Sequence, residues 1–149
     1  MRQCKIVLFL CTVAGLALCG CTGSESASHG GAAPAQTAST LNVYYFHRTI
    51  RCPSCEKIEA LARKAVEAGF ADELAAKRMN WRAVNIDEPQ NKHFDEDYRL
   101  QMQSVVVSEV RDGKEVRWKN LGKVWDLLDD EAGFVQYVQD EIRAYAQGI

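Results

Sequence analysis

The sequence predicts an α/β domain with a central four-stranded mixed sheet flanked by helices. Segments of strand-like and helix-like pattern alternate along residues 41–149 in the order strand, helix, strand, helix, two strands, helix. The first strand–helix–strand run requires a parallel pair, whereas Asp112-Gly113 is a two-residue turn that joins antiparallel strands. A mixed sheet with helices on both faces satisfies both requirements.

The domain begins with a buried strand and an amphipathic helix. Residues 42–46 (Asn-Val-Tyr-Tyr-Phe) are rich in aromatic and β-branched side chains, which is typical of a buried strand. After Cys52, apolar residues recur at spacings of three and four, which is one face of a helix that Gly69 should end. Residues 70–77 can add a further helical turn or two. The predicted inner face of the helix consists of Ile58, Leu61, Ala62, Ala65, Val66 and Gly69.

The middle of the domain continues the alternation. Residues 81–86 are predicted as the second strand, and Asp87-Glu88-Pro89 suits the start of a helix that turns Phe94 and Tyr98 inward. Residues 103–110 contain three consecutive valines, which indicates a strand buried on both sides.

The C-terminal part supplies the last strand and helix. Residues 115–119 alternate strictly between polar and apolar, so we expect one face to pack and the other to meet water. A final helix starts near Asp130. Its inward residues are Phe134, Val138, Ile142 and Tyr145.

The first 20 residues have the pattern of a bacterial lipoprotein signal peptide. Arg2 and Lys5 form a short positive segment, and residues 6–18 are a weakly polar to apolar run of 13 residues. This run is shorter than the about 20 residues that a transmembrane helix needs. Leu18-Cys19-Gly20-Cys21 resembles a lipobox, in which Cys21 is lipidated and becomes the first residue. Ordinary secretion with cleavage nearby is the alternative.

Residues 21–40 would then be the lipidated cysteine and a flexible linker, because residues 22–40 contain no large apolar side chain. We expect a lipid-anchored, extracytoplasmic protein of the bacterial cell envelope. Thr22, rather than an acidic residue, follows Cys21, which resembles outer-membrane lipoproteins that face the periplasm in cells with two membranes. The net charge of −2 and the absence of a basic stripe argue against a nucleic-acid partner. We expect a monomer.

The remaining domain holds two cysteines, Cys52 and Cys55. The other four of the six lie in the signal peptide or at the lipidation site. Cys52-Pro53-Ser54-Cys55 stands where a strand gives way to a helix, which favours a redox role over a structural disulfide. The cofactor we expect is therefore the redox-active disulfide Cys52–Cys55 alone.

The surroundings of Cys52 explain this assignment. Backbone N–H groups at a helix N-terminus, together with the helix dipole, stabilise a thiolate there. Pro53 fits the first helical position, since its missing N–H would have no partner. Arg48 and Arg51 add positive charge, so the pKa of Cys52 should fall below its free value of about 8.5. Cys55, one turn further on, should be more buried and act as the resolving thiol.

The element order, with Cys-x-x-Cys at the start of the first long helix, looks like the thioredoxin fold. Residues 43–48 leading to residues 51–55, together with residues 115–121 and Val124-Trp125, more closely resemble the ArsF-type thioredoxin-like proteins, often labelled as a nitrophenyl compound nitroreductase subunit. The resemblance implies a thiol-disulfide oxidoreductase or redox-partner subunit. Its partners would be cell-envelope thiols or disulfides and a protein that resets the pair.

Two features depart from ordinary thioredoxins. Gln103 or Ser104 occupies the loop opposite the cysteines, where thioredoxins carry a cis-proline, and a trans peptide is expected because cis costs about 2.5–4 kcal/mol without proline. Tyr44, Tyr45 and Phe46 also offer no buried acid in the first strand.

Two other functions stay open at this stage. His47 could join Cys52 and Cys55 as a third ligand for zinc or copper(I), which would make the protein a soft-metal or metalloid-binding lipoprotein. The domain could also be a non-catalytic interaction module that uses a surface marked by Trp81, Trp118 or Trp125, although aromatic residues at such positions more often belong to the core.

The lipobox prediction can be tested with Cys21→Ser. Because acyl chains on Cys21 would supply the membrane affinity, wild type should enter the detergent phase of a detergent-partitioning experiment and the variant should stay in the aqueous phase. Equal partitioning of both proteins into detergent would contradict the prediction.

Overall fold

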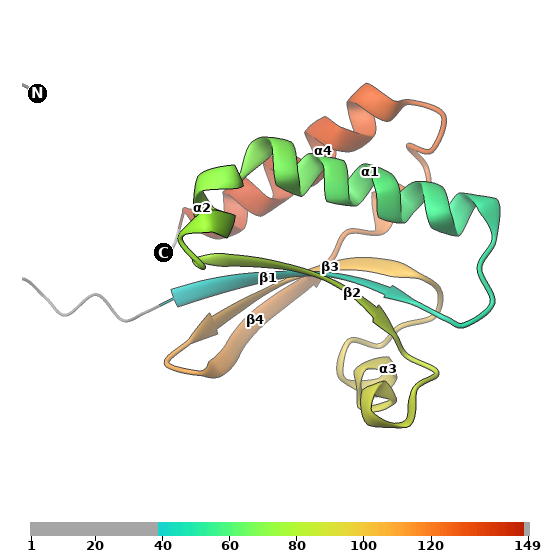
Figure 1. Cartoon of the computed structure of the whole chain (residues 1–149), viewed down its shortest axis with the longest axis horizontal. Helices are drawn as coiled ribbons and strands as arrows, with labels where there is room; N and C mark the ends of the chain where they lie inside the picture. Colours follow the sequence, from blue (N-terminus) through green and yellow to red (C-terminus); the bar gives the residue numbers. More distant parts are fainter. Residues whose placement is uncertain (1–38, 148–149) are drawn as a thin grey trace, which may run out of the picture. The chain divides into compact units, whose positions relative to one another are not determined.

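The computed structural model describes residues 39–147 (Figure 1). The predicted signal peptide, Cys21 and the linker up to residue 38 lie outside the described residues. The described elements follow the predicted order, with three differences. The helix predicted after residue 87 is divided into a 3₁₀ turn and a short helix, the second strand spans residues 79–85 and not 81–86, and a 3₁₀ turn at residues 122–124 was not predicted. The elements are β1 (Ser39–His47), α1 (Pro53–Gly69), α2 (Ala71–Ala75), β2 (Met79–Asn85), η1 (Pro89–Asn91), α3 (His93–Asp97), β3 (Ser104–Arg111), β4 (Lys114–Asn120), η2 (Gly122–Val124) and α4 (Glu131–Ala146).

The four strands form one sheet in the order β2-β1-β3-β4. β1 pairs with β2 in parallel and with β3 antiparallel, and β3 pairs with β4 antiparallel. Figure 1 shows α1 and α4 side by side over one face of the sheet, with α3 at the other. This arrangement confirms the predicted mixed sheet and is that of a thioredoxin-like fold. Ser39 and Thr40, which we predicted to belong to the linker, are part of β1.

Both faces of the sheet are covered by packed side chains. The predicted inner faces of α1 and α4 pack against β1 and β3 and are buried, except for Gly69 and Tyr145, which are half-buried. Val105, Val106 and Val107 are fully buried, as expected for a central strand. A second cluster lies between the sheet and α3 and includes the predicted inward residue Tyr98, with Phe94 packed against it. Two apolar layers therefore fix β1, and with it the chain that leads to Cys52.

The turn between β3 and β4 was correctly predicted, but the strict alternation of β4 was not. Asp112 and Gly113 have φ of 50° and 76°, as a type I′ hairpin turn requires. A β-bulge then shifts the register between Glu109 and Val110, which leaves Val116 half exposed. As a result Glu115 and Trp118 both contact Tyr98, although an unbroken alternation would place them on opposite faces.

Among the helices of residues 39–147, none combines the length and the hydropathy that a membrane span requires.

Glu109 of β3 is a fully buried carboxylate at the end of the sheet where the domain begins. It accepts hydrogen bonds from the side chains of Ser39, Arg111 and Arg117. Burial alone would raise the pKa of Glu109, but these hydrogen bonds outweigh it and hold the pKa below the usual value of 4.5. The carboxylate thus ties the start of β1 to the β3–β4 hairpin.

Glu109→Gln should lower the free energy of unfolding at pH 7 by about 1–2 kcal/mol, because the arginines lose a charged acceptor. The folded-state pKa of Glu109 is depressed, so its contribution is present above pH 4.5 and is lost as pH falls further. Urea unfolding at pH 7 and at pH 3 should therefore show a smaller difference between wild type and variant at pH 3. An equal difference at both pH values would contradict this role.

Candidate functional site

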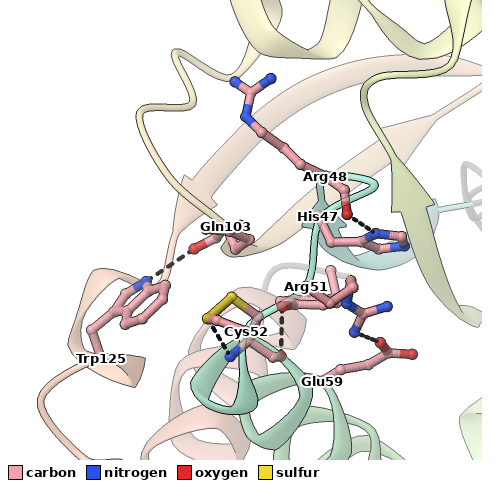
Figure 2. Close-up of a disulfide and its surroundings, with 9 residues drawn as sticks. His47, Arg48, Arg51, Cys52, Glu59, Gln103 and Trp125 are labelled. Atoms are coloured by element: carbon pink, nitrogen blue, oxygen red, sulfur yellow. Dashed lines mark hydrogen bonds and ion pairs between the residues drawn. A yellow bond between two sulfur atoms is a disulfide. The ribbon is translucent and has the colours of Figure 1, made fainter.

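The two cysteines form a disulfide at the junction of β1 and α1, with their Cα atoms 5.0 Å apart (Figure 2). Cys52 is the N-cap of α1 and Pro53 its first residue, as predicted. The Cys52 sulfur accepts a hydrogen bond from the backbone N–H of Cys55 at 3.2 Å. Cys52, Pro53 and Ser54 are exposed, whereas Cys55 is 2% exposed. The predicted difference in burial between the two thiols is confirmed.

Tyr45 of β1 connects this junction to the sheet. Its ring is fully buried, and its hydroxyl donates a hydrogen bond to the Cys55 carbonyl at 2.6 Å. Burial raises the pKa of Tyr45 to about 12, so the phenol remains a protonated donor near neutral pH. Tyr45, in place of an acid, therefore gives β1 a neutral donor to the Cys55 backbone.

The two arginines predicted to act on Cys52 are both paired with carboxylates. Arg48 bonds Asp87 and Asp95, each at 3.1 Å, and Figure 2 shows its side chain directed away from the disulfide. Arg51 pairs with Glu59 and lies 5.7 Å from the centre of the Tyr45 ring. Each of these arginines has a nearby negative partner. The N-terminus of α1 is therefore the main feature of the structure that stabilises a Cys52 thiolate.

His47 does not approach the sulfurs in the way a third metal ligand must. Its Nδ1 lies 3.1 Å from the Arg48 carbonyl oxygen, and its ring stacks on Tyr45. Within residues 39–147 no group of three His, Cys, Asp or Glu side chains is placed to hold a metal ion. The Cys₂His ligand set is therefore not assembled around this disulfide.

The predicted opposite-loop candidates are Gln103, which directly precedes β3, and Ser104, which is the first residue of β3. Trp125 donates its indole N–H to the Gln103 carbonyl at 2.9 Å, and Ser104 donates to the Met102 carbonyl at 2.9 Å. Figure 2 places Gln103 and Trp125 on the side of the disulfide away from Arg51 and Glu59. The described residues contain no cis peptide bond, which confirms the trans peptide expected here.

Three residues of the site were not assigned to it from the sequence. Glu59 lies one helical turn after Cys55, so its spacing could have suggested it as the partner of a nearby arginine. Tyr45 was predicted as part of the buried first strand and was noted for lacking a carboxylate, but it was not assigned to the site. Trp125 is 22 residues from the carbonyl that it binds, and nothing in the local sequence indicates this contact.

No family model and no curated protein matches the chain. Among solved structures, a thioredoxin from Trypanosoma brucei brucei is 21% identical, with a TM-score of 0.39, over 70% of this chain and 76% of that one. A thioredoxin from Fasciola hepatica (20% identical, 62% and 81% covered, TM-score 0.35) and one from Thermus thermophilus (20%, 60% and 72%, TM-score 0.37) are also similar.

The strand order is that of a thioredoxin-like fold, and a Cys-x-x-Cys disulfide lies at the start of its first helix.

Cys52 should be the more acidic thiol of the reduced pair. In Cys55→Ser, which leaves Cys52 as the thiol of the motif, the rate of alkylation against pH should have its midpoint below about 8.5 because of the helix N-terminus. Adding Arg48→Gln should leave this midpoint unchanged, since Arg48 is occupied by Asp87 and Asp95. A midpoint at or above 8.5 would contradict the prediction.

Proposed function

We propose that the protein is a membrane-anchored, extracytoplasmic thiol–disulfide exchange protein that works through Cys52 and Cys55. The observation that supports this most is the unequal burial of the two sulfur-bearing residues, one exposed at a helix N-terminus and one covered. A purely structural disulfide has no need of this asymmetry. Closing a loop of this length also constrains little chain entropy.

In the reducing direction, the Cys52 thiolate attacks one sulfur of a partner disulfide. A Cys52–partner disulfide forms and the other partner sulfur leaves as a thiolate, which takes up a proton. The Cys55 thiol then loses its proton to water and attacks the Cys52 sulfur. The Cys52–Cys55 disulfide forms, and the second partner sulfur leaves and is protonated. The partner gains two electrons and two protons, and the cysteine pair loses them. Partner thiols and the oxidised pair react by the same steps in reverse.

The location and the finer family are part of the proposal. The lipobox pattern ending at Cys21 supports a lipid anchor, and residues 22–40 would let the domain reach partners near the membrane surface. The resemblance of residues 43–48, 51–55 and 115–121 and of Val124-Trp125 to ArsF-type proteins supports a redox-partner role in the cell envelope. The partners would be envelope proteins with accessible thiols or disulfides and a protein that resets the pair.

Exchange predicts a difference between the two single-cysteine variants. Cys55→Ser cannot resolve the mixed disulfide and should accumulate Cys52-linked partners, seen on a non-reducing gel of membrane extracts. Cys52→Ser retains the buried thiol and should trap few. The same bands should vanish in the double variant and under reductant. If neither variant traps a partner, or Cys52→Ser traps as many as Cys55→Ser, the exchange mechanism is wrong.

A further inference from the structure

A groove of about 280 Å³ lies where the chain enters β3 and where it leaves β4. Its lining includes Met102 and Ser104, which flank Gln103, and Trp125, which binds the Gln103 carbonyl. Figure 2 draws Gln103 and Trp125 in the surroundings of the disulfide, so the groove shares Trp125 with those surroundings.

The groove combines apolar side chains with the polar residues Gln101, Ser104 and Asn120, and it has a single charge. Met102 is one of the exposed large hydrophobic residues of the domain, at 52%, and Trp125 is half buried. Arg99 is the one charged side chain among the lining residues. Unlike Arg48 and Arg51, Arg99 has no ion-pair partner within the part of the chain that the structure describes. Its guanidinium is therefore available to an incoming carboxylate.

The backbone around Arg99 is fixed. Arg99 lies between the buried residues Tyr98 and Leu100, and its own N–H donates to the Glu96 carbonyl at 3.2 Å. The Leu100 N–H donates to the Asp95 carbonyl at 2.9 Å. Arg99 has a φ of 50°, a conformation that glycine adopts more readily after a helix. Arg99 therefore lines the groove in a backbone conformation that is unfavourable for residues other than glycine.

We propose that this groove selects extended partner segments that carry an acidic side chain near the reacting cysteine, with Arg99 as the specificity-determining residue. The proposal rests on the proposed exchange function and names its substrate class. A guanidinium binds a carboxylate through two parallel hydrogen bonds. The flexible Met102 side chain can adapt to different apolar neighbours of that carboxylate.

The test uses the full chain with serine at Cys4, Cys11, Cys19 and Cys21, so that Cys52 and Cys55 are its sole thiols. Two peptides differ only by Glu or Gln beside a central serine, which replaces the reacting cysteine. Their affinities for the oxidised chain, measured by tryptophan fluorescence, should differ about threefold in favour of Glu. The preference should disappear in Arg99→Gln and at 1 M salt.

Lys77→Gln is the matched control, since Lys77 also has a positive φ, of 56°, but does not line this groove. It should keep the preference. Equal affinity of both peptides for wild type, or a preference that survives Arg99→Gln, would overturn the proposal.

A separate assay keeps the two proposals distinguishable. Reduced wild type and the control Lys77→Gln should both exchange at the same rate with hydroxyethyl disulfide, which is uncharged. Failure of both to react would contradict the exchange function, whereas the peptide affinities of the oxidised chain decide the acidic preference independently.

Discussion

The placement of the disulfide depends on the hydrogen bond from the buried Tyr45 hydroxyl to the Cys55 carbonyl. It joins the central strand β1 to the first turn of α1, so that Cys55 is covered while Cys52 remains at the surface. A buried hydroxyl without a partner costs about 1–3 kcal/mol, which favours keeping this bond formed. The unequal burial of Cys52 and Cys55 therefore results from the contact between β1 and the first turn of α1.

Ion pairs hold the short loop between β1 and α1 at both of its ends. Arg48 bonds Asp87 and Asp95, and the Thr49 N–H donates to Asp87 at 2.8 Å. At the other end, Arg51 pairs with Glu59 of α1. The exposed pairs of Arg48 each stabilise by only about 0–1 kcal/mol, whereas the Arg51–Glu59 pair is half-buried. The main effect of these pairs is to fix the path of the chain that leads to Cys52. Ile50, in the same loop, remains exposed.

Much of the fold and the centre of the site could be predicted from the sequence, because local patterns encode them. The helix face from Ile58 to Val66 follows from periodicity, and the hairpin follows from the Asp112-Gly113 pair. Contacts between distant residues could not be predicted in this way. The pairing of Arg48 with Asp95 spans 47 residues, and the bulge at Val116 depends on how β3 and β4 pair. These contacts exist only once the sheet has formed.

The reduction potential of the Cys52–Cys55 pair tests the central claim most directly. The full chain with serine at the four cysteines before residue 22 can be equilibrated in thiol–disulfide buffers of known potential and then alkylated. Its oxidised fraction is read by mass. A redox-active pair should show one reversible two-electron transition between about −120 and −270 mV, the range of thioredoxin-like exchange proteins. A disulfide that stays oxidised below about −300 mV would be a structural bond and would contradict the account.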